Sequence, residues 1–370
     1  MTFKKQFGIG LLKIFLVLWI FIFLFWRAFQ NDAVDQLIRS PKNGSFLFYG
    51  VLLNLMATVL TMIRWNWLVR IQKISLSYQS ALRFGFIGYL FNLSPIGIVG
   101  GDAVKAYLLF RKEKSNSFSK SLPSELLSSD SSVRISEGSS KDYLSRNIAS
   151  VIIDRVIGLY VMFLLGFITI LTSGFVFFEQ KEAKVAIATV FVLFIVSTIG
   201  LLVLFLPETG NHWRHKQIQK IPGVGSKLDS FLSIVQIYRS HPFLLGLSAG
   251  VTLLVHFLFS ASLFCIAKGL YQNVPSFYDH LVIYPIANIG SMIPLSAGPL
   301  EYFLDLLYPL FSIENQAPFR IGYGMLVGVA FRLATLLVAA IGVLFYFASR
   351  DEVSFALNEM NQLPENDSNK

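Results

Sequence analysis

The sequence predicts an all-α integral membrane protein with six spanning helices and two re-entrant hairpins broken by proline and glycine. Three observations lead to this fold class. The 370-residue chain is 54% hydrophobic and only 14% charged, whereas soluble domains carry roughly 25% charged residues. Six apolar runs reach the length that a bilayer-crossing helix needs, about 20 residues. Two shorter apolar pieces, one in each half of the chain, contain residues that break helices.

The six predicted spans cover 11–29, 46–63, 148–172, 185–206, 243–267 and 321–348. The first follows two lysines, as a signal peptide would, but no small-residue cleavage site comes after it, so we expect a retained span. One membrane domain is expected over 1–350. The serine-rich stretch 115–142 and the tail 351–370 have the composition of disordered segments.

Basic residues predict the orientation of the chain. With the N-terminus in the cytoplasm, the inner segments hold 20 Lys and Arg and the outer segments hold 5. This bias places both termini in the cytoplasm of a multi-pass cell (inner) membrane protein, provided that both broken pieces return to the side they entered. The net charge of +9 lies in these loops, so nucleic acid is not expected as a partner. The single cysteine, Cys265, excludes a disulfide framework.

The two broken hairpins are predicted over 82–112 and 281–312. Helix-breaking residues mark their turns: Pro95, Gly97, Gly100 and Gly101 in the first, and Pro294 and Gly298 in the second. Irregular backbone at membrane depth must be buried in protein or line a wet cavity. Hairpins in matching positions of two halves indicate an inverted repeat with a shared cavity near the midplane. The alternative is structural, because Gly and Pro also mark kinks and close packing in membrane helices.

Each hairpin carries a carboxylate after its turn. Asp102 is expected to cap a helix over 102–112, with Lys105 one turn further on the same face. Glu301 shares a helix face with Asp305, and Pro299 suits the first position of that helix.

Three charged residues fall deep inside predicted spans, namely Asp154, Arg155 and Arg332. A charge at this depth costs several kcal/mol unless it is paired or hydrated. We expect Arg332 to pair with Glu301 or Asp305, and Lys105 to pair with Asp154. Two interpretations stay open: ion pairs that only position helices, and a polar path that receives a charged headgroup.

Enzyme signatures are not found in the sequence. It has no G-x-S-x-G elbow, P-loop, HExxH or GxGxxG in a βαβ setting. His212 and His215 form an HxxH without a nearby cysteine or carboxylate pair, which is a weak metal motif. We therefore expect a protein that is not an enzyme, without cofactor, metal or catalytic residues.

Three motifs resemble those of the flippase-like membrane family, which includes the transmembrane region of lysylphosphatidylglycerol synthases and the UPF0104 proteins. NLSPIGIVGGDAVKAYLL is similar to a family motif that contains G-G-D-x-x-R, IIDRVIGLYVM to D-R-x-x-G-L, and MIPLSAGPLEYF to an I-P motif that ends in glutamate. Lys105 stands where the family has arginine, and SAGPLE lacks one of the usual glycines. The soluble aminoacyl-transferase domain of the synthases does not appear in this sequence.

The resemblance implies lipid translocation or handling without the synthetic step. The lipid would be an anionic or aminoacylated phospholipid or a polyprenyl-phosphate carrier, and the enzyme that makes it is a candidate partner. The expected substrate-binding residues are Gly100, Gly101, Asp102, Lys105, Asp154, Arg155, Glu301 and Arg332. Two alternatives remain, a membrane-embedded transferase acting on a lipid-linked substrate and a scaffold subunit for such an enzyme.

Overall fold

The computed structural model describes residues 3–92, 98–121, 137–172, 181–205, 235–293, 295, 297–311 and 321–350. Within these ranges the regular structure is helical throughout. Five helices are long and apolar enough to cross a membrane, and the described apolar part of a further helix, Ala188–Leu202, is shorter. The predicted all-α membrane class is thereby confirmed, whereas the number of spans stays a prediction.

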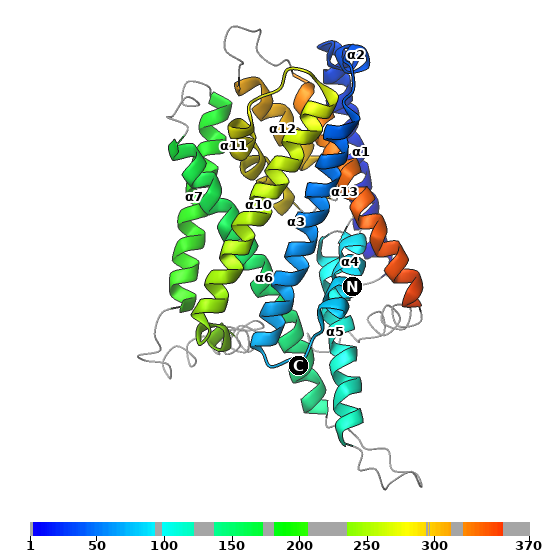
Figure 1. The fold of residues 1–370 in the computed structure, drawn as a ribbon, viewed down its shortest axis with the longest axis vertical. Helices are drawn as coiled ribbons and strands as arrows, with labels where there is room; N and C mark the ends of the chain where they lie inside the picture. Colours follow the sequence, from blue (N-terminus) through cyan, green and yellow to red (C-terminus); the bar gives the residue numbers. More distant parts are fainter. Residues whose placement is uncertain are drawn as a thin grey trace.

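The helices form two consecutive sets along the chain (Figure 1). The first contains α1 (Phe3–Gln30), α2 (Ala33–Arg39), α3 (Gly44–Ile71), α4 (Tyr78–Asn92), α5 (Ile98–Ser121), α6 (Glu137–Thr172) and α7 (Lys181–Phe205). The second contains α10 (Pro242–Leu270), α11 (Phe277–Asn288), the 3₁₀ turn η2 (Ile289–Met292), α12 (Pro299–Leu307), the 3₁₀ turn η3 (Tyr308–Leu310) and α13 (Tyr323–Ala348). Each half thus has a long helix, a pair of shorter helices and a second long helix.

Helices α3 and α10 form the most extensive contact between the halves. The Ser262 hydroxyl donates to the Gly50 carbonyl at 2.7 Å, and a Cβ atom on Gly50 would lie 2.6 Å from the Ile266 side chain. Small residues allow such backbone proximity, on which helix association in membranes depends. The first long helix of each half therefore packs against its counterpart.

The pairs α4–α5 and α11–α12 lie toward opposite ends of the molecule (Figure 1). Helix α6 contacts both α5 and α11, and helix α13 contacts both α4 and α12. The second long helix of each half therefore bridges the two helix pairs.

The first helix pair is held by direct backbone contact. A Cβ atom on Gly101 would meet the Gly88 carbonyl oxygen at 2.0 Å and Asn92 Oδ1 at 2.4 Å. Only glycine allows the two helices to pack this closely. Gly100 and Gly101 therefore lie inside α5, with Gly101 as a packing residue, and the predicted break residues Pro95 and Gly97 lie outside the described residues.

The second pair turns at Gly298, whose φ of +104° favours glycine. Helix α12 begins at Pro299, as predicted. Pro294, the other predicted break residue, lies outside the described part of the chain.

Two expectations at helix ends need correction. Helix α5 already includes Ile98, so Asp102 lies within the helix and does not cap it. The predicted disordered loop 115–142 is helical at both ends, because α5 continues to Ser121 and α6 begins at Glu137. The part of this loop at 122–136 and the tail 351–370 lie outside the described residues.

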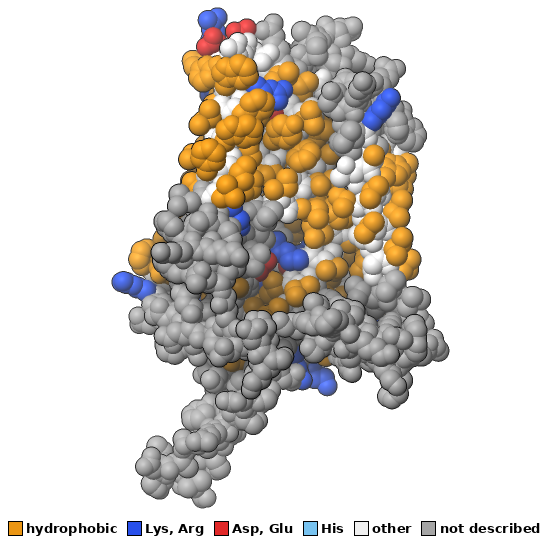
Figure 2. All heavy atoms as spheres, turned by 180° about the vertical axis from the view of Figure 1, so that it is seen from behind, with side chains coloured by type: hydrophobic (Ala, Val, Ile, Leu, Met, Phe, Trp, Pro, Cys, Tyr) orange, Lys and Arg blue, Asp and Glu red, His pale blue; other side chains and the backbone are white. Residues whose placement is uncertain are grey.

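Large apolar side chains cover much of the outer surface (Figure 2). Trp19, Leu337 and Phe347 are examples, each more than half exposed. Such a surface is unfavourable in water and suits the hydrocarbon core of a bilayer.

Candidate functional site

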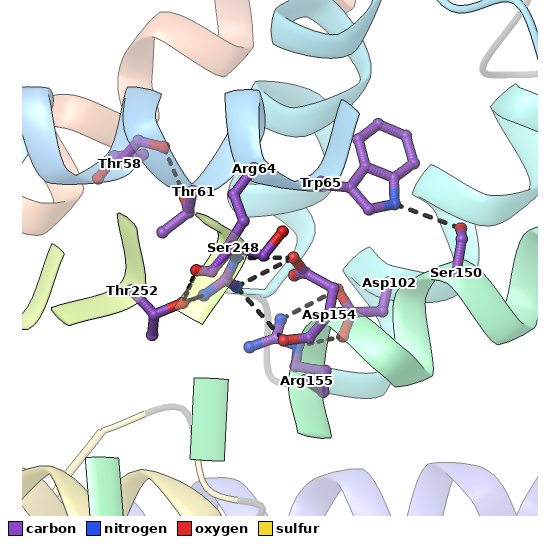
Figure 3. A network of polar contacts seen from close by, with 10 residues as sticks. All are labelled: Thr58, Thr61, Arg64, Trp65, Asp102, Ser150, Asp154, Arg155, Ser248 and Thr252. Atoms are coloured by element: carbon purple, nitrogen blue, oxygen red, sulfur yellow. Dashed lines mark hydrogen bonds and ion pairs between the residues drawn. The ribbon is translucent and has the colours of Figure 1, made fainter. Parts of the chain in front are cut away.

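Arg155 and Asp102 form a two-pronged ion pair between α6 and α5. Arg155 Nε donates to Asp102 Oδ2 at 2.7 Å, and Nη2 donates to Oδ1 at 3.0 Å (Figure 3). The Arg155 side chain is 47% exposed and that of Asp102 is 17% exposed. Parallel bonds of this kind fix the orientation of the guanidinium group while leaving part of it accessible.

A second arginine binds the neighbouring carboxylate from α3. Arg64 Nε lies 3.0 Å from Asp154 Oδ1, and Nη1 donates to the Thr252 hydroxyl at 2.6 Å (Figure 3). Both charged side chains are less than a tenth exposed. This buried pair and its bond to Thr252 connect α3, α6 and α10. The prediction that Asp154 pairs with Lys105 is therefore wrong.

Lys105 instead lies over an aromatic ring. Its Nζ atom is 4.2 Å from the centroid of the Trp65 ring, and the Trp65 indole donates to the Ser150 hydroxyl at 3.4 Å. Such a contact stabilises a cation that has little water around it. Asp154 and Asp102 are near enough for their charges to act on Lys105, so it belongs to the same group without a direct ion pair.

At the other helix pair, Glu301 binds Arg332 of α13. Arg332 Nε donates to Glu301 Oε1 at 2.8 Å, and the Gly298 amide donates to Oε2 at 2.8 Å. Glu301 is fully buried, whereas the Arg332 side chain is 22% exposed. The predicted pairing of these two residues is confirmed.

Asp305, the other partner predicted for Arg332, pairs with Arg27 instead. Its Oδ1 atom accepts from the Gly322 amide at 2.5 Å, and its Oδ2 atom lies 3.6 Å from Arg27 Nη1 of α1. Asp305 therefore holds the start of α13 and α1 against α12.

Neutral polar groups lie along α3 and α13 beside the ion pairs. Asn54 and Thr58 are on α3, which also carries Arg64, and Thr335 lies one turn beyond Arg332 in α13. Tyr89 packs where α3, α4 and α13 meet. Asn54 Nδ2 donates to Thr335 Oγ1 at 3.4 Å. We call Asn54, Thr58, Tyr89 and Thr335 the central polar cluster.

The predicted site residues therefore form two groups rather than one. Asp102, Lys105, Asp154 and Arg155 lie together at the first helix pair, and the second group contains the ion pair of α12 and α13. The expected direct convergence of all these charges on one chamber is therefore wrong for the described residues, in which the two ion pairs are separate. On the face shown in Figure 2, basic and acidic side chains lie in a recess between apolar surfaces.

Sequence reasoning missed Arg64 because the predicted span stopped before it, whereas α3 continues to Ile71. It also missed Arg27, which lies near the end of the first predicted span and of α1. A signal for Arg64 was present, since Thr58 and Thr61 recur at helical spacing and Arg64 continues that polar face by three residues.

No group of three or more metal-ligating side chains lies among the residues with described positions. His212 and His215 of the weak HxxH motif fall outside them.

Comparison with known proteins adds a family. The family of the lysylphosphatidylglycerol synthase TM region matches residues 10–342. A UPF0104 membrane protein of Pyrococcus horikoshii is 26% identical over 100 residues, which is 27% of this chain and 29% of the length of that protein. No solved structure matches the chain.

Proposed function

Because this chain belongs to the family of the lysylphosphatidylglycerol synthase transmembrane region, we propose that it translocates the headgroup of a phosphate-bearing lipid. The lipid is a phospholipid or a polyprenyl-phosphate carrier. Its headgroup follows a polar path from one ion pair to the other while its tails stay in the bilayer. This path proceeds from Asp102–Arg155 through the central polar cluster to Glu301–Arg332.

Two partly exposed arginines carry the proposal. Arg155 and Arg332 are the exposed partners of their ion pairs, at 47% and 22%. A guanidinium group binds phosphate through two parallel hydrogen bonds. A phosphate that reaches either arginine can therefore replace the carboxylate oxygens without leaving the cation unpaired.

The carboxylates keep the empty path electrically balanced. Asp102 and Glu301 neutralise their arginines, since an unpaired charge at membrane depth costs several kcal/mol. They also favour a headgroup that carries a positive amine next to its phosphate. Lys105 and the Arg64–Asp154 pair hold the surroundings of the Asp102–Arg155 pair in place. The close contact of Gly101 with Gly88 fixes α5.

The energetics and orientation of the proposal follow from the sequence. Without a nucleotide-binding motif, movement along this path is passive or coupled to an ion gradient. The positive-inside bias predicts that the α4–α5 end is in the cytoplasm. The Asp102–Arg155 pair then faces the inner leaflet, and the Glu301–Arg332 pair faces the outer leaflet. The enzyme that makes the lipid is the proposed protein partner.

Transport of labelled lipid in proteoliposomes tests the proposal. Full-length protein is reconstituted with fluorescent phosphatidylglycerol, and an impermeant quencher reports the fraction that changes leaflet. Arg155→Gln and Arg332→Gln should each slow exchange about tenfold, because each removes charge-assisted hydrogen bonds to phosphate. Arg39→Gln is the matched control, because Arg39 lies in the last turn of α2, outside the proposed path.

The rivals predict other outcomes in the same experiment. A membrane-embedded transferase would modify the lipid, which mass spectrometry of the extracted lipids would detect. A scaffold subunit would leave exchange at the rate of protein-free vesicles for the wild type and all variants. Neither result is compatible with the proposed translocation for the lipids tested.

A further inference from the structure

A basic pocket of about 630 Å³ lies where α3 ends and α4 begins. Three of the residues that line it are basic, Arg70, Lys73 and Lys112, and two carry hydroxyl groups, Ser75 and Ser77. None of the described residues lining the pocket is acidic. Its lining belongs to α3, α5 and the loop before α4 and includes none of the residues of the two ion pairs.

The loop that forms the pocket is held in one conformation by its own contacts. Ile74 and Leu76 are buried in the core between α3, α4 and α5. The Leu76 carbonyl accepts hydrogen bonds from Arg70 Nε and Nη2 at 3.2 and 3.0 Å and from Asn66 Nδ2 at 3.0 Å. Ser77 accepts a hydrogen bond from the Ser80 amide at 3.2 Å and so caps α4. The pocket is therefore organised before any ligand arrives.

Lys73 has an unusual backbone conformation in this loop. Its φ is +63°, in the left-handed region where glycine normally ends a helix. Strained positions of this kind persist at ligand-binding sites, where the side chain has a use that glycine cannot supply. Lys73 is one of the residues that line the pocket.

Aromatic residues beside the pocket indicate its depth. The Trp67 indole donates to the Tyr78 hydroxyl at 3.2 Å, and the Arg70 guanidinium carbon lies 4.6 Å from the centroid of the Tyr78 ring. Tyr78 is 46% exposed. Tryptophan and tyrosine are enriched at the level of the lipid headgroups, so the pocket faces the headgroup layer.

We propose that this pocket binds the phosphate group of a membrane lipid from the leaflet on the α3–α4 side. Lys73, Lys112 and Arg70 supply the positive charge, and the Ser75 hydroxyl supplies a donor. Binding here needs no movement of lipid across the membrane. The site therefore stands or fails separately from the proposed translocation.

Calorimetric titration of the full chain in an uncharged detergent tests the site. The probes are dioctanoyl phosphatidylglycerol, inorganic phosphate and dioctanoylglycerol, which has no phosphate. Lys73→Gln with Lys112→Gln should weaken phosphatidylglycerol binding about tenfold or more, since charge-assisted hydrogen bonds are lost. The same binding should weaken as salt rises. Lys268→Gln is the matched control, because Lys268 lies in the last turn of α10 and does not line the pocket. This variant should bind as the wild type does.

Two further variants separate this site from folding effects and from the proposed path. Lys73→Arg keeps the charge and the backbone strain, so it should retain binding. Arg155→Gln with Arg332→Gln should also retain it, because neither residue lines the pocket. Binding of inorganic phosphate with no binding of phosphatidylglycerol would assign the pocket to free phosphate and overturn the lipid source. Equal binding of dioctanoylglycerol, or no effect of the double lysine variant, would overturn the phosphate site.

Discussion

Each accessible ion pair joins a carboxylate on a short helix to an arginine on the long helix that follows it. Glu301 is fully buried, and Arg332 keeps 22% of its side chain exposed. Removing one partner of such a pair leaves an uncompensated charge, whereas removing both does not. The pair is therefore tested best by single and double variants together.

Glu301→Gln and Arg332→Gln should each destabilise the protein by on the order of 3 kcal/mol. The double variant should lose clearly less than the sum of the two, because the remaining amides can hydrogen-bond to each other. Chemical unfolding in detergent, followed by circular dichroism, measures these changes. Strictly additive losses would mean that the two side chains do not interact.

Tyr89 tests the central polar cluster. Tyr89→Phe removes one hydroxyl while keeping the ring. We expect lipid exchange to fall about tenfold, since one hydrogen bond to a passing charged group is worth about 1.5 kcal/mol, with an unchanged helix content. Tyr78→Phe is the control in the exchange assay, because Tyr78 is an exposed tyrosine at the first residue of α4. An unchanged rate for Tyr89→Phe would remove Tyr89 from the proposed path.

At this scale the sequence predicted the charged residues better than their partners. The pairing of Arg332 with Glu301 could be predicted because one arginine deep in a span needs a carboxylate at the same depth. The partner of Asp154 could not, since Arg64 and Lys105 are both near enough and only the packing of α3 against α6 decides between them.

At the level of helices, two glycine contacts set how closely neighbouring elements pack. A Cβ atom on Gly101 would lie 2.0 Å from the Gly88 carbonyl oxygen, and one on Gly324 would lie 2.1 Å from the Leu304 carbonyl oxygen. Real Cβ atoms do not approach backbone atoms this closely, so one helix would have to move.

Gly101→Ala should separate α5 from α4. It should lower the free energy of unfolding by about 3 kcal/mol or more, as overpacking of a protein core does. Gly246→Ala is the matched control, because nothing lies within 4 Å of a Cβ atom at that position in α10. Its melting temperature should stay the same or rise, since alanine favours a helix more than glycine does. Melting of both variants in the same detergent decides the comparison.

The sequence predicted where the helices lie but not all of their ends. Apolar runs of about 20 residues are a strong signal. Four of the predicted runs fall within α1, α3, α6 and α10, while the runs 185–206 and 321–348 extend beyond α7 and α13 by at most two residues. The predicted span over 46–63 stopped before Arg64, yet α3 continues to Ile71 because Asp154 and Thr252 satisfy that arginine. Tertiary partners thus extend a helix past a charge that local composition treats as its end.

For the whole molecule, orientation in the membrane is the main prediction still to be tested. The bias of basic residues places the loop that contains Ser75 in the cytoplasm and the loop that contains Asn273 outside. Both residues are exposed, so each can be replaced by cysteine in a chain where Cys265 has been changed to alanine. In intact cells an impermeant maleimide should label Asn273→Cys and not Ser75→Cys. The reverse pattern would invert the proposed topology.

The bridging role of α6 and α13 has a mechanical consequence. Arg155 of α6 is paired with α5 but its helix also contacts α11, and Arg332 of α13 is paired with α12 but its helix also contacts α4. Each arginine is therefore held by both helix pairs. A movement at one helix pair therefore changes the contacts of a helix that also packs on the other pair.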